Sequence, residues 1–194
     1  MSDSTILYLD SPGKENTDRV IEAVIERLKR MDIRHVVVAS DTGETGKKVL
    51  DRLKGMKVEV VVVTSHYGFD KEGECAMSPE AENELRSAGA KLVRASHVLS
   101  GVERSISKKL GGASRVEMIA ETLRALFGQG LKVAVEITVM AADSGAIPCG
   151  PDVQVISIGG TESGADTACV VRPAHANSFF NFRVKEIIAL PRGR

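Results

Sequence analysis

The sequence predicts an α/β fold, a three-layer α/β/α sandwich whose sheet is mostly parallel and has antiparallel strands at its C-terminal edge. Short β-branched runs alternate with amphipathic helical patterns, which is typical of right-handed βαβ crossovers and of a sheet covered on both faces. Turns rather than helices separate the last predicted strands, and this favours antiparallel pairing there. Because no linker interrupts the 194 residues, we expect a single domain over residues 1–194.

The first half of the chain predicts four strands and three helices. A helix capped by Asn16 or Thr17 follows the first strand, and a second helix begins near Gly46. Ser78 and Pro79 open the third helix, because serine is a favoured cap and proline fits the first helical turn. The strands are expected at residues 6–9, 36–39, 58–63 and 91–94.

The second half predicts two capped helices and four further strands. Ser100 with Glu103, and Ser114 with Glu117, match the spacing of a capping box. Apolar residues continue at helical spacing through residue 126, and Gly128 ends that helix. The further strands are expected at residues 131–139, 153–158, 167–171 and 184–190.

The composition excludes several classes of protein. The 26 basic residues balance the 26 acidic ones, and aromatic residues make up 4% of the chain with no Trp. A nucleic-acid partner is therefore not expected, because neither a basic surface nor stacking side chains are available. No signal sequence and no apolar run of roughly 20 residues is recognised, so we expect no membrane association and a cytoplasmic location. The three cysteines form no CxxC pair, and no metal is expected.

Residues 40–46 are the sharpest candidate for a ligand site. They follow a predicted strand, precede a predicted helix, and carry hydroxyl groups at Ser40, Thr42 and Thr45 beside the unhindered backbone of Gly43. A helix start presents unpaired N–H groups and a partial positive charge, so this loop can bind a phosphate. The alternative is a helix simply capped by Thr42. The spacing matches neither a dinucleotide-binding motif nor a P-loop.

Two further strand ends repeat the pattern of a hydroxyl residue followed by glycine. Ser65 and His66 follow the strand at residues 58–63, and Ser96 and His97 follow the strand at 91–94. Parallel strands end on one edge of a sheet, where ligands of open α/β folds bind, although serine and glycine are also ordinary turn residues. Each histidine is either a ligand contact or proton shuttle, or a hydrogen-bonded structural residue. No catalytic residue is assigned.

Four other residues enter the candidate site. Glu136 lies in the apolar segment 131–139, where a carboxylate is costly to bury without a partner, so it is either functional or held by a salt bridge or backbone donors. Asp143 follows that segment and is expected on the same edge as Ser40. Lys14 and Asn16, in the loop after the first strand, are expected to face the ligand, with a solvated surface lysine as the alternative for Lys14.

These segments resemble a known family. Residues 36–45 resemble the phosphate loop in the C-terminal regulatory domain of pyruvate kinases, and residues 152–167 are similar to the strand–glycine turn–strand element that closes that domain. More closely, the whole chain resembles stand-alone proteins with a pyruvate kinase C-terminal-domain-like (pyruvate kinase alpha/beta domain) fold. The matching segments are residues 12–17, 96–105, 135–145 and 164–168.

The resemblance implies a three-layer α/β/α sheet and an association with flavin mononucleotide (FMN). Carried onto this chain, Ser40, Thr42, Gly43 and Thr45 become ligands of the phosphate of FMN or of a similar phosphorylated small molecule, with Glu44 in the same loop. Pyruvate kinase activity is not expected, because the chain is too short to include the barrel that carries it.

Three hypotheses of function remain open at this point. The first is an FMN-binding protein of unknown reaction, with oxidoreductase chemistry as one possibility and the question of catalysis undecided. The second is a non-catalytic sensor of phosphorylated metabolites. The third is a scaffold subunit that uses the Phe179–Phe180–Phe182 cluster. We also expect a homo-oligomer, because we expect the C-terminal strands to leave a sheet edge exposed beside this cluster.

Overall fold

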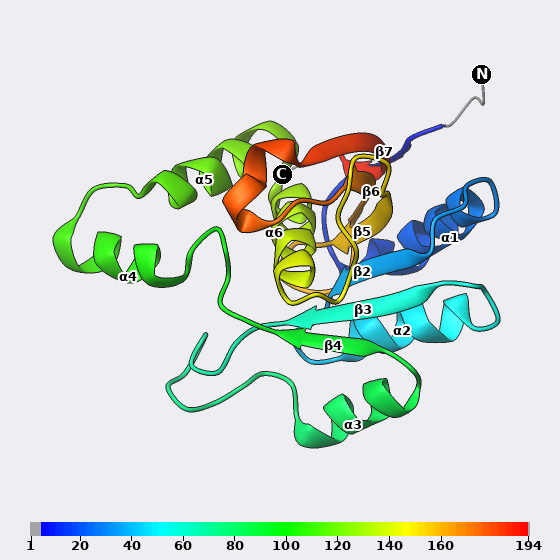
Figure 1. Cartoon of the computed structure of the whole chain (residues 1–194), viewed down its shortest axis with the longest axis horizontal. Helices are drawn as coiled ribbons and strands as arrows, with labels where there is room; N and C mark the ends of the chain where they lie inside the picture. The colour runs from blue at the N-terminus through cyan, green and yellow to red at the C-terminus, as the bar shows by residue number, and fades with distance from the viewer. Residues whose placement is uncertain (1–4, 194) are drawn as a thin grey trace.

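A seven-stranded sheet with the strand order β1-β7-β6-β5-β2-β3-β4 forms the centre of the molecule in a computed structural model, which describes residues 5–193. The fold is α/β and the sheet is mixed but mostly parallel, as the sequence predicts (Figure 1). The strands are β1 (Leu7–Leu9), β2 (His35–Ala39), β3 (Glu59–Thr64), β4 (Lys91–Arg94), β5 (Val155–Gly159), β6 (Thr167–Arg172) and β7 (Arg183–Pro191).

The antiparallel pairs lie toward the C-terminal side of the sheet. Strand β6 runs antiparallel to both β5 and β7, whereas β2 pairs in parallel with β3 and β5, and β3 with β4. The N-terminal strand β1 then adds to β7 in parallel and forms the edge. The expectation that the C-terminal strands leave an exposed edge is therefore wrong, because β1 covers β7.

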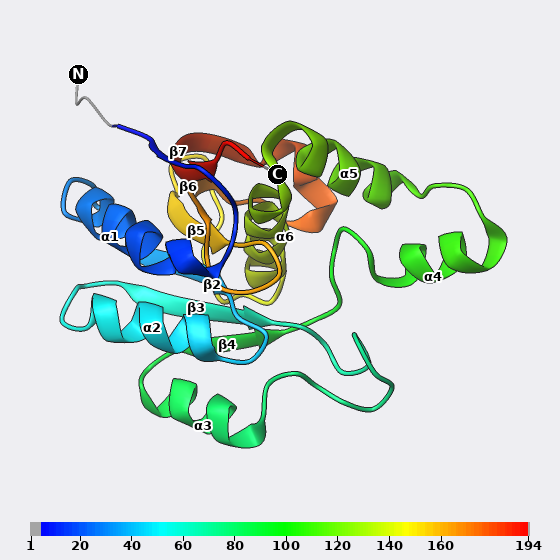
Figure 2. The ribbon, with the colours of Figure 1, turned by 180° about the vertical axis from the view of Figure 1, so that it is seen from behind.

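Three helices cover one face of the sheet (Figure 2). They are α1 (Thr17–Leu28), α2 (Glu44–Leu53) and α3 (Pro79–Ser87). Their apolar residues recur at helical spacing and share one buried cluster with the strands, and Val20, Val49 and Leu85 contribute one residue from each helix. The predicted cap of α3 is confirmed, because the Ser78 hydroxyl accepts a hydrogen bond from the Ala81 amide at 3.2 Å.

Helix α6 (Gln129–Asp143) covers the opposite face. The strand expected at residues 131–139 is therefore wrong. The helix lies very close to the sheet, because a Cβ atom on Gly159 would lie 2.2 Å from the carbonyl oxygen of Gly130. A Cβ atom on Gly130 would in turn lie 2.2 Å from the Thr167 hydroxyl. These two glycines bring the N-terminus of α6 against the ends of β5 and β6, and its C-terminus lies at the far end of the sheet.

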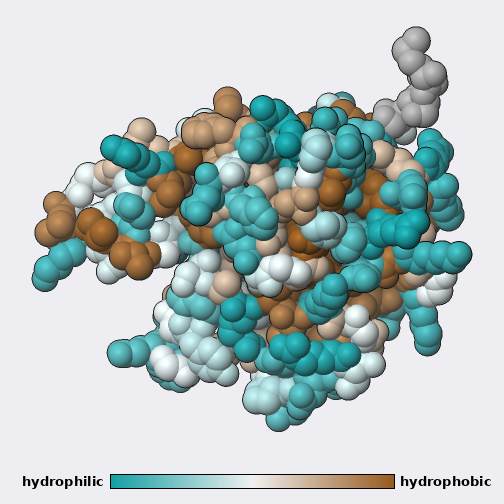
Figure 3. Space-filling view, in the orientation of Figure 1, coloured by the Kyte–Doolittle hydropathy of each residue, from teal (hydrophilic) through white to brown (hydrophobic). Residues whose placement is uncertain are grey.

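Helices α4 (Gly101–Leu110) and α5 (Arg115–Phe127) form an arm that extends from the sheet (Figure 1). The capping box of α5 is confirmed, since Ser114 and Glu117 bond reciprocally. The box expected at the start of α4 does not form, because the Ser100 side chain makes no capping hydrogen bond. Helix α4 has no buried residue, and apolar side chains gather on the surface at its end of the molecule (Figure 3).

Two short 3₁₀ helices complete the chain, η1 (Lys14–Asn16) before α1 and η2 (Ala176–Asn181) before β7. Within residues 5–193, no helix is long and apolar enough to cross a membrane. The same part of the chain brings together no group of three or more His, Cys, Asp or Glu side chains that could hold a metal ion.

Candidate functional site

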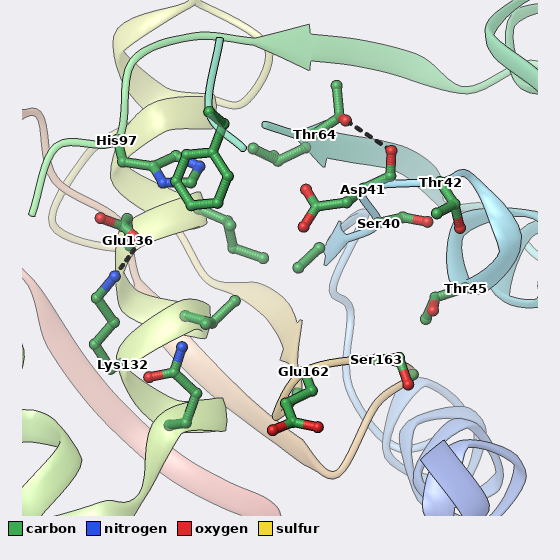
Figure 4. A pocket seen from close by; sticks show the side chains of 18 of the residues that line it. Ser40, Asp41, Thr42, Thr45, Thr64, His97, Lys132, Glu136, Glu162 and Ser163 are labelled. Carbon is green, nitrogen blue, oxygen red and sulfur yellow. Dashed lines mark hydrogen bonds and ion pairs between the residues drawn. The ribbon is translucent and has the colours of Figure 1, made fainter. Parts of the chain in front are cut away.

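A cavity of about 320 Å³ lies where β2, β3 and β5 end, and we refer to it as the rim cavity (Figure 4). Its volume falls in the range of small-molecule sites. One side is formed by residues 39–45 and by residues 160–164 of the β5–β6 turn. The other side is formed by His97 and by side chains of α4, α5 and α6. The cavity lies beyond the C-terminal ends of parallel strands, the usual binding position in open α/β sheets.

The loop between β2 and α2 contributes hydroxyl groups and the start of a helix. Thr42 and Thr45 line the cavity, and the Ser40 hydroxyl accepts a hydrogen bond from the Gly46 amide at 3.1 Å. The amides of Glu44 and Thr45 donate no hydrogen bond to any residue that the structure describes. Unpaired amides at a helix N-terminus attract anions. The N-cap of α2 is Gly43 without a side-chain capping bond, so the alternative in which Thr42 caps this helix is wrong.

Gly43 has a conformational role in this loop. Its φ of 98° lies in the left-handed region that favours glycine. A Cβ atom there would lie 3.3 Å from the Cβ atom of Ala81, so it would point toward α3. Gly43 therefore allows the turn from which α2 starts, and its own Cα does not line the cavity.

Asp41 is anchored to the neighbouring strand. One oxygen of its carboxylate accepts hydrogen bonds from the Ser65 amide at 3.0 Å and from the Ser65 hydroxyl at 2.6 Å. Ser65 is buried at the end of β3 and acts through Asp41 rather than by lining the cavity. This bond ties the β2 and β3 loops together at the edge of the cavity.

The β5–β6 turn lies beside the α2 start, on the same side of the cavity. Ser163 and Glu162 project from this turn, and Glu162 has a φ of 60° (Figure 4). A Cβ atom on Gly164 would lie 2.6 Å from the Cα atom of Lys14, so the turn packs directly on the loop after β1. The Thr17 hydroxyl accepts a hydrogen bond from the Ala165 amide at 3.0 Å and holds the two segments together.

Helix α6 places a buried ion pair in the cavity wall. Lys132 and Glu136 lie one helical turn apart, form an ion pair and hydrogen bond, and each has a side chain that is 4% exposed. The second oxygen of Glu136 accepts a hydrogen bond from the Leu99 amide at 2.9 Å. Of the structural partners predicted for Glu136, a salt bridge and a backbone donor are therefore both present. Burial lowers the pKa of Lys132, while the charge of Glu136 opposes that shift.

Aromatic rings form the upper wall of the cavity as drawn in Figure 4. The ring centroids of Phe69 and His97 are 4.6 Å apart, and those of His66 and His97 are 5.8 Å apart. His66 also contacts the carbonyl oxygen of Tyr67 at 2.6 Å through Nδ1. Phe69 and His97 line the cavity, whereas His66 contacts their rings without lining it.

The pKa of His97 predicts a pH dependence of stability. Burial lowers this pKa from its ordinary value of 6.5; Lys132 and His66 lower it further, whereas Glu136 and Asp41 raise it. The unfolded chain therefore binds a proton first as the pH falls. We expect the free energy of unfolding to decrease as the pH falls below about 6.5 and through the lower folded pKa. Urea denaturation at pH 7.5 and pH 5.5 measures this loss of stability, and His97→Gln should lose less than the wild-type protein. An identical loss in the variant and the wild type would contradict the prediction.

The remaining predicted residues lie outside the rim cavity. Lys14 lines a neighbouring hollow that shares Thr45 and Ser163 with the rim cavity. Asn16 is buried and donates through its side-chain amide to the carbonyl oxygens of Ser11 and Gly13, at 2.9 and 3.2 Å. Ser96 is exposed and does not line the cavity.

Asp143 lies at the end of α6 away from the cavity. Its carboxylate accepts hydrogen bonds at 3.1 Å from the Ala176 amide and contacts His175 Nδ1 at 3.1 Å. The expectation that Asp143 shares an edge with Ser40 is wrong. Because the segment before it is a helix antiparallel to β5, its end lies at the opposite side of the sheet.

Sequence reasoning missed the side chains that the α4–α5 arm and α6 bring to the cavity. They are Arg104 from α4, Arg124 from α5, and Gln129 and Lys132 from α6. The i, i+4 spacing of Lys132 and Glu136 was the available signal for a pair. No sequence spacing relates Arg104 to Arg124, because only the fold of the arm brings them to one cavity.

The matches to solved structures include a weak likeness to an enzyme. An O-ureido-L-serine synthase, solved as a mutant with O-ureido-L-serine bound, is 17% identical and has a TM-score of 0.30. The match covers 72% of this chain and 49% of that one, so the chain spans about half the length of that enzyme. A TM-score this low supports no conclusion on fold or function.

Comparison with family models gives a match that covers most of the chain. The model described as "Pyruvate kinase, alpha/beta domain" matches residues 18–171. The match includes the β2–α2 loop, helix α6 and the β5–β6 turn, and therefore most of the rim cavity. On this evidence the chain belongs to the pyruvate kinase alpha/beta domain family.

Proposed function

We propose that this protein binds a phosphorylated small molecule in the rim cavity, with the phosphate at the start of α2. The observation that carries the proposal is the pair of unbonded amides at Glu44 and Thr45. The hydroxyl groups of Thr42, Thr45 and Ser163 face the same region (Figure 4). Phosphate needs several short donors and gains from the positive end of a helix dipole.

Both acidic and basic side chains lie near the start of α2, so some of them disfavour a bound anion and others favour it. Asp41 and Glu44 are acidic, but an oxygen of Asp41 is already engaged by Ser65. Lys14 and Lys48 line the neighbouring hollow, on the other side of Thr45. Lys14 supplies positive charge to this hollow, whereas Lys48 is already paired with Asp18 at 3.0 Å.

We propose FMN as the specific ligand. The family resemblance suggests it, and two features of the cavity fit it: the donors at the α2 start suit its phosphate, and the wall formed by Phe69 and His97 offers an aromatic surface for a planar ring. Bound FMN would supply one- or two-electron redox chemistry. The residues of this chain would bind the phosphate, pack against the ring and exclude water.

Titration of FMN into the purified protein, followed by flavin fluorescence, tests the proposal. We expect saturable binding of FMN and much weaker binding of riboflavin, which lacks the phosphate. Equal binding of the two would contradict a phosphate site. A thermal shift with sugar phosphates but none with FMN would instead support the alternative, a sensor of phosphorylated metabolites, since any ligand that prefers the folded state raises the melting temperature.

We also propose that the chain forms a homo-oligomer, with a second copy covering α4. Val102, Ile106 and Leu110 are spaced four residues apart, so they form one stripe, and Val102 and Leu110 are 75% and 78% exposed. A ten-residue helix is marginal without packing, and a symmetric contact would bury the stripe against itself.

Light scattering at high protein concentration tests the homo-oligomer. We expect Leu110→Asp to reduce the molar mass to that of the monomer. Phe180, which is 87% exposed in the C-terminal cluster, provides the comparison, and Phe180→Asp should leave the mass unchanged. The reverse result would place the contact at the phenylalanine cluster, and a monomeric wild-type protein would contradict the oligomer itself.

A further inference from the structure

Basic side chains line the rim cavity on the side away from the α2 start, with the carboxylate of Glu136 among them. Arg104, Arg124 and Lys132 line this end, each from a different helix. Figure 4 shows Lys132 and Glu136 on one side of the cavity, with Thr42 and Thr45 on the other. The two ends of the cavity therefore present different chemistry to a ligand.

These three cations differ in whether an acidic side chain pairs with them. Lys132 is paired with buried Glu136, and Arg124 is paired with Glu121 and donates to the Gln129 side chain at 2.6 Å. Arg104 makes no ion pair and no hydrogen bond with its side chain to any residue in 5–193, and its guanidinium lies 5.9 Å from the centre of the Phe69 ring. One partly buried guanidinium in the cavity wall is thus left without an acceptor.

The pKa of Lys132 shows that Arg104 and Arg124 lie close enough to this lysine to act on its charge. Burial is the largest cause that lowers it and Glu136 raises it, while the charges of Arg124 and Arg104 make smaller contributions that lower it further. Like charges in one cavity wall repel, and Glu136 and Glu121 offset this repulsion for Lys132 and Arg124. Arg104 has no ion pair within residues 5–193, so a negatively charged ligand group beside it would offset its charge.

We propose that this end of the cavity binds the carboxylate of a small organic acid, with Arg104 as its principal donor. A guanidinium presents two parallel N–H groups that match the two oxygens of a carboxylate. A singly charged carboxylate suits the site better than a doubly charged phosphate, because the carboxylate of Glu136 belongs to the same wall. The Phe69 ring gives the apolar part of such an acid a surface to contact.

The position gives this acid a role beside the phosphorylated ligand. Only this role rests on the proposed function. With FMN bound at the α2 start, an acid held by Arg104 would lie in the same cavity as the flavin. The substrate class of this protein would then be small carboxylic acids. Binding of the acid itself depends only on the arginine end of the cavity.

Thermal-shift titrations of the whole chain with sodium acetate, glycolate and benzoate test the proposal, with sodium chloride at matched ionic strength as the reference. We expect a saturable rise in melting temperature with half-saturation at millimolar concentration. Arg104→Gln should weaken this binding at least tenfold, since a hydrogen bond to a charged group is lost. Arg104→Lys should weaken it less, because the charge remains while the paired donors are lost.

Lys108→Gln is the matched control, since Lys108 is an exposed cation on the same helix that does not line the cavity. It should bind the carboxylates as the wild-type protein does. The absence of any saturable shift, equal binding by Arg104→Gln, or a shift with inorganic phosphate but none with carboxylates would each overturn the proposal. Repeating the titration with FMN separates the two proposals, because failure of FMN to bind leaves the Arg104-dependent carboxylate binding intact.

Discussion

Glu136→Ala is expected to reduce the free energy of unfolding by about 3–5 kcal/mol, because it leaves a buried charge without a partner. Lys132 and Glu136 are each only 4% exposed. The substitution also removes the acceptor for the Leu99 amide. Urea denaturation at pH 7.5 measures the change, and the connection that contains His97 should become more accessible to hydrogen exchange.

Two further variants show whether the effect comes from the unpaired charge. Glu136→Gln keeps the shape and an acceptor for Leu99 but removes the negative charge, so it should be destabilised less than Glu136→Ala. The double variant Lys132→Met with Glu136→Leu replaces the pair by apolar groups, and such replacements are often neutral or stabilising. We expect it to recover much of the stability lost in Glu136→Ala. A double variant as unstable as Glu136→Ala would show that cavity formation, and not the stranded lysine, dominates.

The same ion pair lies in the segment where the sequence and the fold differ most. Residues 131–139 alternate β-branched with other residues, at Val133, Val135, Ile137 and Val139, and this predicts a strand. In α6 nearly every residue from Gly130 to Ala142 is buried, so no polar face is left to reveal a helical period. The 15-residue length of the helix was the better guide, since strands are usually shorter.

The other elements follow their local signals. Strand β3, with four consecutive valines at 60–63, lies between β2 and β4 in the parallel part of the sheet, where both faces are buried. The caps at Ser78 and Ser114 form as predicted. The position of β1 at the sheet edge could not be predicted, because pairing with β7 joins residues more than 180 positions apart in the chain.

The candidate site, like the fold, could be predicted from the sequence only in part. The β2–α2 loop could be identified because strand, hydroxyl residues, glycine and helix start are consecutive in the sequence. His97 and Glu136 could be singled out one at a time, but their arrangement around Leu99 required the fold. No sequence pattern identifies Arg104, because only the folded position of α4 brings its guanidinium to the cavity.

Thr45→Val is expected to weaken FMN binding by about 10- to 150-fold if the phosphate is bound at the start of α2. The substitution keeps the branched shape of the side chain and removes the hydroxyl that lines the cavity. A hydrogen bond to a charged group contributes about 1.5–3 kcal/mol, which corresponds to that range of affinity. Flavin fluorescence titration measures the dissociation constant.

Thr45→Ser supplies the matched control, because it retains the hydroxyl at the same position of α2 and should bind FMN nearly as well as the wild-type protein. Gly43 is a poor choice for such a test, since its φ of 98° would make any substitution strain the loop itself. Riboflavin adds the second control: it has no phosphate, so its weak binding should be the same in Thr45→Val and in the wild type. If Thr45→Val weakens riboflavin and FMN equally, the hydroxyl acts on the ring or on the fold. If it weakens neither, the phosphate is not bound at this helix start.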